Sequence, residues 1–548
     1  MHQRNPDDTT GQNFDAVVIG AGFGGMYQLH LLRQQGLSVR VYDGAGGVGG
    51  TWWWNRYPGA RVDFPGGPYY CYTFSEELVR EWDWTETQPD QPAVLAYLNH
   101  VADKFDLRRD IQLETWIRSA HYDAPAQRWR LETHAGAHVS AQFLICAVGI
   151  LSAPYKPDIT GIDDFAGELY HTGQWPQREV SFAGKRVGVI GTGSSGVQAI
   201  PVIAESASHL TVFQRTPQFT LPAGNRPLDP EFVRETRENW PAVRKAMLES
   251  PFGAPFGLPD RSAHDDTPEQ RNALYETLWQ RGGLGIAFNS YNDILFEPGA
   301  NETLAEFVRA KIRATVDNPD TAESLLPYYY LGTKRQILDT GYYQTYNRDN
   351  VTLVDLRKEP IERITAGSIR TAAREHDLDM LVLATGYDAI TGTLLRLDPV
   401  GLDGIALSEQ WRERFGTYLG LTIPNLPNLF LIHGPESPSV LFNMPLGAEL
   451  EAEWIRDCIM HMRAEGIGSI RPAPGTAWGE EVAAIAAHTL FPQTDSWYTG
   501  ANIPGKHRQF AVHLGGAGYF QRIAKVARDG YEGFVLEAER ALHAVAQG

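Results

Sequence analysis

Two glycine-rich turns carry the clearest chemical signal in this chain of 548 residues. Each follows a short apolar run and precedes a segment with helical spacing, which predicts a strand, a tight turn and the start of a helix. A helix N-terminus offers free N–H groups to negative charge, and glycines let a pyrophosphate approach closely. Two dinucleotides are therefore predicted to bind in one chain. The defining glycines are Gly20, Gly22 and Gly25 in the first turn and Gly191, Gly193 and Gly196 in the second.

The residue that ends the next strand differs between the two units. In the first unit Asp43 follows, and a carboxylate at this point accepts hydrogen bonds from a ribose diol. In the second unit Arg215 and Thr216 stand there, with no acid. An arginine can bind a 2′-phosphate that an acid would repel, so the second dinucleotide is predicted to be NADPH. The alternative for Arg215 is an ordinary surface arginine.

The segment after Asp43 decides which turn takes the other cofactor. Residues 48–63 combine glycines, which allow close approach to a bulky ring system, with several tryptophans and a tyrosine that can wall it. This composition fits a flavin, so we place FAD at the first turn and NADPH at the second. The pair suits electron transfer from a nicotinamide to a flavin.

Composition limits the other possibilities. Apolar residues make up 43 % of the chain, charged residues 21 %, and the net charge is −18, which argues against a nucleic-acid surface. The longest apolar run, residues 143–151, is too short to span a bilayer, and the first residues lack a secretory pattern, so a cytoplasmic location with no membrane partner is predicted. The three cysteines are far apart, which predicts neither a metal site nor a redox dithiol.

The order of these elements predicts an α/β fold with two Rossmann-like dinucleotide-binding domains and a helical insertion. We assign residues 1–150 and 380–548 to a discontinuous FAD-binding domain. Residues 151–217 and 332–379 form the predicted NADPH-binding domain. Residues 218–331, rich in charged, aromatic and proline residues, form the predicted helical insertion, whose role the sequence leaves open.

Two longer motifs resemble those of the Type I Baeyer–Villiger monooxygenases, flavin enzymes that insert an oxygen atom beside a ketone carbonyl. The short fingerprint of that family, F-x-G-x-x-x-H-x-x-x-W-P/D, is filled by Phe165, Gly167, His171, Trp175 and Pro176. Its longer signature is filled by Gly49, Gly50, Trp52, Tyr57, Pro58, Gly59 and Asp63. Segments around Arg335, Gly386 and Trp497 also resemble the family, whereas the insertion shows little likeness.

The resemblance implies FAD- and NADPH-dependent conversion of ketones to esters or lactones with O2, through a flavin C4a-peroxide. Arg335 would be the catalytic cation, with Asp63 as its partner, because arginine stabilises an anion without giving up its proton. A second phosphate contact or a structural ion pair is the alternative for Arg335. His171 and Trp175 would couple domain position to NADP occupancy, or simply pack.

The resemblance also implies a set of binding residues. Phe442 and Leu441 would line a pocket for a bulky or cyclic ketone. The further contacts expected with the cofactors are Thr51, Trp52, Tyr69 and Met444 for FAD, and Ser194, Ser195, Lys334 and Trp497 for NADPH.

The main alternative is a flavin-dependent amine or sulfide oxygenase, which shares both turns. Trp175-Pro176 and Lys334-Arg335 favour ketone oxygenation instead. A reductase that passes electrons to a protein partner, and a scaffold without catalysis, are less well supported. The natural ketone, the stereochemistry and the oligomeric state are not fixed by the sequence.

Overall fold

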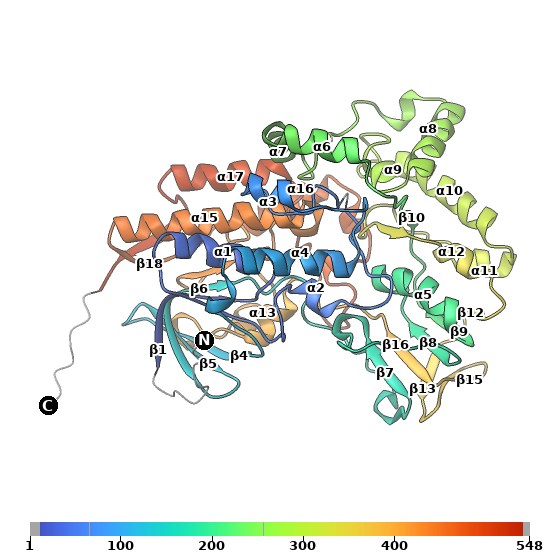
Figure 1. The fold of residues 1–548 in the computed structure, drawn as a ribbon, viewed down its shortest axis with the longest axis horizontal. Coiled ribbons are helices and arrows are strands. Elements are labelled where there is room, and N and C mark those ends of the chain that lie inside the picture. The colour runs from blue at the N-terminus through green and yellow to red at the C-terminus, as the bar shows by residue number, and fades with distance from the viewer. Residues whose placement is uncertain (1–10, 65, 256, 541–548) are drawn as a thin grey trace.

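The structure is a computed structural model that describes residues 11–64, 66–255 and 257–540. Figure 1 shows three regions: a first sheet covered by helices from both ends of the chain, a second sheet, and a group of helices beside it. The orange and red helices of the last third lie beside the blue helices of the first third. This arrangement confirms the predicted α/β fold with two dinucleotide-binding units and a helical insertion.

The first sheet has seven strands in the order β3-β2-β1-β6-β5-β4, with β17 paired to β6. Its β1, β2, β3, β6 and β17 are parallel, while β4 and β5 form an antiparallel extension. The strands are β1 (Gln12–Ile19), β2 (Val39–Tyr42), β3 (Ile111–Gln112), β4 (Ile117–Asp123), β5 (Arg128–Thr133), β6 (His138–Cys146) and β17 (Leu429–Leu431). The last third of the chain thus contributes a strand to the first sheet.

The second sheet is parallel throughout, in the order β12-β9-β8-β16-β7. Its strands are β7 (Glu168–His171), β8 (Arg186–Ile190), β9 (His209–Gln214), β12 (Val351–Asp355) and β16 (Met380–Leu383). The predicted domain boundary at residue 380 is therefore misplaced, because β16 pairs with both β7 and β8 and so belongs to the second sheet. A buried strand followed by a glycine has the same sequence pattern in the first sheet as in the second. The pattern alone therefore could not assign residues 380–383 to one of the two sheets.

The insertion between the two halves of the second unit is mainly helical, as predicted. A short parallel pair, β10 (Thr220–Pro222) and β11 (Ile337–Asp339), joins its beginning and end. Between them lie α6 (Pro230–Glu238), α7 (Trp240–Glu249), α8 (Pro268–Arg281), α9 (Gly285–Phe288), α10 (Pro298–Thr315) and α11 (Pro319–Ser324). Five of these six helices carry proline in the first turn, where its missing N–H costs no hydrogen bond.

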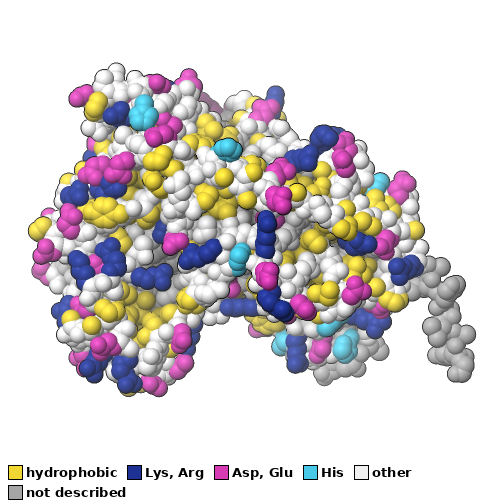
Figure 2. Space-filling model, turned by 180° about the vertical axis from the view of Figure 1, so that it is seen from behind, with side chains coloured by type: hydrophobic (Ala, Val, Ile, Leu, Met, Phe, Trp, Pro, Cys, Tyr) yellow, Lys and Arg dark blue, Asp and Glu magenta, His cyan; other side chains and the backbone are white. Residues whose placement is uncertain are grey.

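The remaining elements connect and cover the sheets. They are α1 (Phe23–Gln34), α2 (Thr51–Trp54), α3 (Glu76–Glu81), α4 (Gln91–Lys104), α5 (Ser194–Ser206), α12 (Tyr342–Thr345), β13 (Ile361–Ile364), β14 (Ser368–Thr371), β15 (Glu375–Asp377), α13 (Gly392–Leu397), α14 (Leu407–Gln410), α15 (Met444–Ala464), β18 (Ile467–Pro472), α16 (Trp478–Ala487), α17 (Ala517–Arg528) and β19 (Phe534–Ala538). No helix in the described part of the chain is long and apolar enough to cross a membrane. On the face shown in Figure 2, basic and acidic side chains are interspersed.

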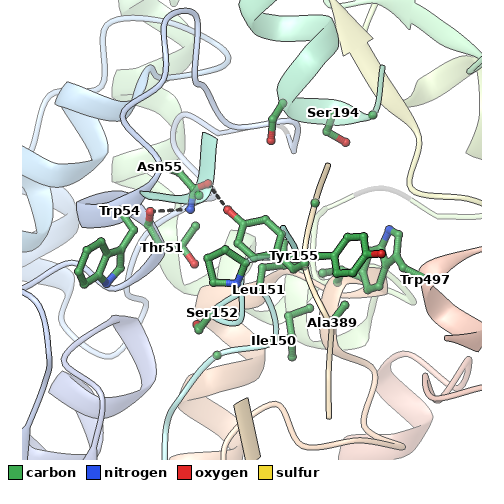
Figure 3. Close-up of a pocket in the computed structure, with 18 of the residues that line it drawn as sticks. Thr51, Trp54, Asn55, Ile150, Leu151, Ser152, Tyr155, Ser194, Ala389 and Trp497 are labelled. Carbon is green, nitrogen blue, oxygen red and sulfur yellow. Dashed lines mark hydrogen bonds between the residues drawn. The ribbon is translucent and has the colours of Figure 1, made fainter. Parts of the chain in front are cut away.

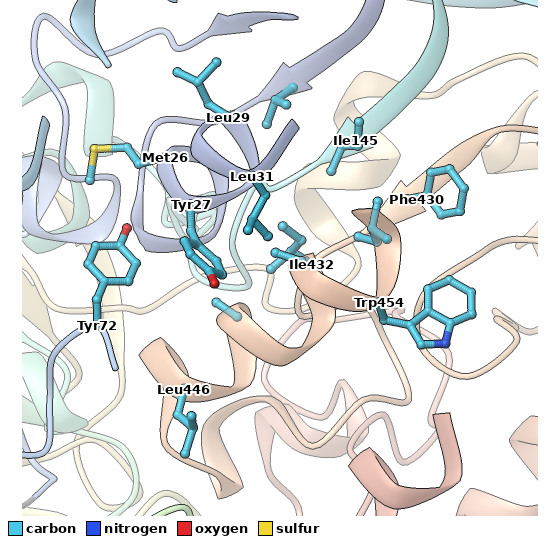
Figure 4. Packing of buried hydrophobic residues seen from close by; sticks show 14 of the residues in the cluster. Met26, Tyr27, Leu29, Leu31, Tyr72, Ile145, Phe430, Ile432, Leu446 and Trp454 are labelled. Carbon is cyan, nitrogen blue, oxygen red and sulfur yellow. The ribbon is translucent and has the colours of Figure 1, made fainter. Parts of the chain in front are cut away.

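The core beneath the first glycine turn is formed by α1 and α15, which pack side by side on the first sheet (Figure 4). Leu29, Leu446 and Ile455 are fully buried there, and each such side chain contributes about 1.5–3 kcal/mol through burial. Residues from the start and the end of the chain thus hold the first turn in place together.

Two buried carboxyl groups lie on α15 within this core. Glu449 accepts hydrogen bonds from the N–H and hydroxyl of Thr73, and Glu451 accepts one from the N–H of His433 at 2.6 Å. Burial raises the pKa of each carboxyl to about 8, and the hydrogen bonds only partly oppose it. Both groups are therefore protonated in the folded protein at neutral pH.

We expect stability to fall as pH rises from 6.5 to 8. In this window the folded state holds protons that the unfolded carboxyls, with ordinary pKa values near 4.5, have lost. Below pH 6.5 the buried His433 and His513, with pKa values lowered to about 4, oppose the trend, because they must charge on unfolding. One pKa unit corresponds to about 1.4 kcal/mol, so each carboxyl contributes about 2 kcal/mol to the change.

Urea unfolding at several pH values checks this expectation. Glu451→Gln should remove roughly half of the pH dependence, whereas Glu480→Gln, an exposed position on α16, should leave it intact. An unchanged slope in Glu451→Gln would show that Glu451 titrates normally in the folded protein.

Candidate active site

One large cavity runs between the two glycine turns. It has a volume of about 1500 Å³, above the roughly 300–1000 Å³ of a site for one small molecule. Its walls come from the carboxyl ends of parallel strands in both sheets, including Gly20 after β1, Asp43 after β2, Gly191 after β8 and Arg215 after β9. Ligands of open α/β sheets bind at this edge. Figure 3 shows Thr51, Trp54 and Asn55 in one part of the cavity and Ser194 and Trp497 in others.

The first glycine turn is shaped for close backbone approach. A Cβ atom on Gly25 would lie 1.8 Å from the Gly20 oxygen, so only glycine lets α1 pack this tightly against the strand end. Gly22 lines the cavity and lies against Gly50. A Cβ on Gly50 would lie 3.0 Å from the Gly22 Cα. The turn therefore leaves room for a pyrophosphate at the start of α1.

Asp43 is buried behind this turn. It accepts hydrogen bonds from the N–H of Ala21 at 2.6 Å and from the N–H of Ala45 at 2.8 Å. Burial raises the pKa of Asp43, and the two N–H groups only partly counteract this. The carboxyl group thus fixes the turn, and it also lines the cavity where a ribose would lie.

The second glycine turn repeats this arrangement with one difference. A Cβ on Gly196 would lie 2.3 Å from the Gly191 oxygen, as at the first turn. A Cβ on Gly193 would meet no atom within 4 Å and would project into open space, and Gly193 lines the cavity. Ser194 and Ser195 line the same part of the cavity. Gly25 and Gly196 are not part of the lining, because both lie where helix and strand meet.

A cationic corner lies beside the second turn. Exposed Arg215 and half-buried Lys334 both line the cavity there, together with Thr216. Burial lowers the pKa of Lys334 to about 8; Asp495 opposes this shift and Arg215 adds to it. The Lys334 ammonium lies 4.4 Å from the ring centre of Tyr329. The mutual repulsion of two cations at one corner is relieved by a bound anion.

Arg335 and Asp63 form an ion pair inside the cavity. Nε of Arg335 donates to Oδ2 of Asp63 at 2.8 Å, and Nη2 donates to Oδ1 at 2.5 Å. Nη1 donates to the Val440 oxygen at 2.5 Å. Burial alone would lower the pKa of Arg335, but Asp63 more than compensates and raises it. The result is a cation that stays charged, held in one orientation by three hydrogen bonds.

Two tyrosines next to this ion pair were missed by the sequence analysis. Tyr70 lines the cavity and accepts a hydrogen bond from Nε1 of Trp52 at 3.2 Å. Tyr498 is fully buried, and its phenol interacts electrostatically with Arg335. Burial raises the pKa of both phenols, so both are neutral. Tyr498 follows directly after Trp497, and this adjacency was the available signal.

Some of the other residues predicted from the sequence line the cavity, and some do not. Thr51, Trp52, Phe442, Met444 and Trp497 line it. Tyr69 does not: its ring turns to Phe232 of the insertion, with ring centres 6.4 Å apart, and Tyr70 lines the cavity instead. Leu441 is also outside the lining, which takes its neighbours Val440 and Phe442.

His171 and Trp175 of the short fingerprint lie at and just after the end of β7, and the Trp175 N–H donates to the Trp54 oxygen at 3.3 Å. His171 ends β7; its Nδ1 accepts from the Gly173 N–H at 3.0 Å, and its Nε2 lies 3.3 Å from the Thr385 hydroxyl. Trp175 is buried and packs in the core of the second unit. These contacts are compatible with both interpretations of the pair, packing and coupling.

Tyr387 lies beside His171, with ring centres 6.2 Å apart, and contacts three separate segments of the chain. Its hydroxyl donates to Oδ1 of Asn55 at 2.5 Å, a bond drawn in Figure 3, and its backbone oxygen accepts from Asn502 at 2.7 Å. A Cβ on Gly173 would lie 2.5 Å from the same hydroxyl. Asn55 just after α2, Gly173 and Asn502 are therefore all in contact with one residue, Tyr387.

Comparisons with known proteins agree with this geometry. Residues 17–226 match the family model described as pyridine nucleotide-disulphide oxidoreductase. Among curated proteins, a Baeyer–Villiger monooxygenase of Pseudooceanicola batsensis is 42% identical over 96% of this chain and 97% of its own length. Phenazine N-monooxygenase PhzNO1 of Lysobacter antibioticus is 41% identical over 97% of this chain and 98% of its own.

Solved structures give the same result. An oxidized steroid monooxygenase bound to NADP has a TM-score of 0.91 and 46% identity, and covers 96% of this chain and 100% of its own. A complex of OTEMO with FAD and NADP has a TM-score of 0.92 and 39% identity, with the same coverage.

Proposed function

The chain belongs to the Baeyer–Villiger monooxygenases, and we propose that Arg335 and Asp63 are the residues on which its oxygen transfer depends. It is a FAD- and NADPH-dependent flavoprotein monooxygenase that converts ketones to esters or lactones with O2. One observation supports the proposed residue roles. The Arg335 guanidinium is held by Asp63 inside the cavity that both glycine turns also line.

The residues present fit the two cofactors. Gly193 borders open space in the cavity, and Gly20 and Gly22 line the cavity at the start of α1, so each turn offers backbone to a pyrophosphate. We propose that FAD lies along Gly20–Gly25, Asp43, Thr51 and Trp52, with Met444 at the far wall, and that NADPH lies along Gly191–Gly196, Arg215, Thr216 and Lys334. When bound, the nicotinamide supplies the reducing hydride and the flavin supplies the oxygen-transfer chemistry.

Arg335 acts on the charge that develops on oxygen during the reaction. A preorganised cation that needs no reorientation stabilises such charge strongly in a site poor in water. Because Asp63 holds the pKa of Arg335 above its ordinary value, the guanidinium keeps its proton and the developing anion stays unprotonated. Asp63 thus orients Arg335 and keeps it protonated, and it does not itself transfer a proton.

The walls of the cavity that contains Arg335 also form the proposed ketone site. Tyr70 interacts electrostatically with Arg335 and accepts a hydrogen bond from Trp52, and Phe442 lines the same cavity. An apolar wall of this kind selects a ketone by shape. Phe442 and Val440 are the proposed substrate contacts, and we propose a bulky or cyclic ketone as substrate.

Product analysis tests this function directly. The purified protein, NADPH and air are mixed with a panel of cyclic and arylalkyl ketones, and a matched panel of amines and sulfides. Esters or lactones one oxygen heavier than the ketones are expected by mass spectrometry. N-oxides or S-oxides without esters would favour the amine or sulfide oxygenase, and a relative named for phenazine N-oxidation makes that panel necessary.

We expect Gly193→Ala to raise the KM for NADPH about tenfold and to leave the fold intact. The new methyl group would enter open space in the cavity, where the pyrophosphate approaches the helix N-terminus, and would cost about 1.4 kcal/mol of contact. Gly367→Ala is the matched control, because its Cβ also meets no atom within 4 Å but lies outside the cavity lining. Equal KM values in the two variants would place the NADPH pyrophosphate elsewhere.

A further inference from the structure

Glu436 is a buried acid to which the function proposed above gives no role. It lies in the pocket segment, residues 434–444, but outside the cavity lining, and its side chain is fully buried. Its backbone has a φ of +68°, a left-handed conformation that residues other than glycine rarely adopt. Burial also raises the pKa of its carboxyl group. A residue kept in such a conformation and environment is held there by its contacts.

The carboxyl group of Glu436 joins two other segments of the chain. Its Oε2 accepts hydrogen bonds from the N–H of Thr417 at 2.9 Å and from the Thr417 hydroxyl at 2.8 Å. Its Oε1 accepts a hydrogen bond from Nε2 of Gln509 at 3.2 Å. Gln509 belongs to the late loop, residues 496–513. One side chain therefore ties the late loop to the pocket segment.

Backbone hydrogen bonds connect the same two segments. The N–H of Glu436 donates to the Ala511 oxygen at 2.7 Å, and the N–H of His513 donates to the Ser437 oxygen at 2.9 Å. Within the late loop, the N–H of Ala511 donates to the Tyr498 oxygen at 2.9 Å. The position of Tyr498 is thus linked through two backbone hydrogen bonds to Glu436.

Both segments also reach Arg335. The Val440 oxygen of the pocket segment accepts a hydrogen bond from Nη1 of Arg335 at 2.5 Å. The Tyr498 phenol of the late loop interacts electrostatically with the same guanidinium. Arg335 therefore contacts two segments that Glu436 holds together, and Val440 is only four residues away from Glu436.

We propose that Glu436 is a positioning residue, which fixes Arg335 by holding the pocket segment and the late loop at one spacing. The inference rests on the proposed role of Arg335 in oxygen transfer. Without the carboxyl group both segments would shift, and the guanidinium would lose part of its fixed orientation although Asp63 still binds it. A preorganised charge stabilises a developing anion less well when its position varies. Glu436 touches neither ketone nor cofactor, so it is not a catalytic residue.

Glu436→Gly is the main test variant, because glycine adopts a φ near +68° freely and the variant loses only side-chain contacts. In the holoenzyme the ratio of ester to hydrogen peroxide should fall about tenfold. Glu436→Gln should stay close to the unaltered protein. Its amide can accept from Thr417 and donate to Oε1 of Gln509, a buried atom with no hydrogen-bond partner among the described residues.

Two further variants test the contact from the other side and control for the substitution itself. Gln509→Ala removes the late-loop partner of Glu436 and should lower the ratio about threefold. Asp403→Gly is the matched control, because Asp403 is an exposed acid with a φ of +59° outside the cavity lining. Its ratio should not change.

Combination with Arg335→Ala distinguishes positioning of Arg335 from a general loss of stability. If Glu436 acts through Arg335, adding Glu436→Gly to the Arg335→Ala protein should lower the ratio further by less than about twofold, because the two effects are not additive. A further tenfold fall in the double variant would show that Glu436 acts independently of Arg335, and would overturn the proposal.

Hydrogen exchange gives a second readout that needs no turnover. In the Glu436→Gly holoenzyme the amides of residues 434–444 and 496–513 should exchange about tenfold faster, and in Asp403→Gly they should not. Unchanged exchange or an unchanged ratio in Glu436→Gly would overturn the positioning role alone. A normal ester rate in Arg335→Ala would instead overturn the proposed function.

Discussion

Replacing Arg335 by alanine should reduce ester formation about a hundred- to a thousandfold while NADPH is still consumed. A single preorganised donor aimed at developing charge is worth about this much in comparable sites. Flavin reduction by NADPH needs no cation at this position, so electrons should still reach O2 and appear as hydrogen peroxide. Ester yield and NADPH oxidation, measured in the same reaction, give the two rates.

Two further variants make the Arg335 result specific. Arg335→Lys keeps the charge but cannot bind both oxygens of Asp63, so its ester rate should lie between those of alanine and arginine. Arg186 makes a similar two-oxygen contact with Asp379 outside the cavity lining, and Arg186→Ala should leave the ester-to-peroxide ratio unchanged. A normal ester rate in Arg335→Ala would show that another group stabilises the charge.

Arg215→Ala should lower the preference for NADPH over NADH about ten- to a hundredfold. A charge-assisted contact with the 2′-phosphate contributes about 1.5–3 kcal/mol, and NADH offers no such group. Arg215 is exposed on the cavity wall next to Lys334, and no hydrogen bond to its side chain occurs within the described ranges. The ratio of kcat/KM for the two coenzymes measures the effect.

The Arg215 experiment needs a control for general surface charge. Arg348 is an exposed arginine of the same unit that lies outside the cavity lining, so Arg348→Ala should keep the preference. If the preference survives in Arg215→Ala, Lys334 becomes the better candidate for the 2′-phosphate contact, and Lys334→Ala would then have to abolish it.

The sequence was most informative where backbone geometry restricts the residue type. The third glycine of each turn, Gly25 or Gly196, is required because a Cβ would collide with a carbonyl oxygen. That requirement is local, so the fold class followed from it. The end of the second sheet was misplaced at residue 380 because pairing of β16 depends on partners about two hundred residues earlier in the chain.

Side-chain direction was predicted less well than position. Tyr69 and Leu441 stand in the right segments, but their neighbours Tyr70 and Val440 line the cavity instead. Spacing along a loop carries no fixed period, unlike spacing along a helix or strand.

The hydrogen bond from Nη1 of Arg335 to the Val440 oxygen has a practical consequence for altering the range of ketones accepted. Val440 lies two residues before Phe442, so the segment that lines the pocket also holds the Arg335 guanidinium. Enlarging the pocket by changing the length of that segment would therefore weaken the hold on the Arg335 guanidinium. To accept larger ketones, protein engineers should shorten only the side chain at position 442. An insertion in the loop would also broaden the range of ketones, but more NADPH would be oxidised without ester being formed.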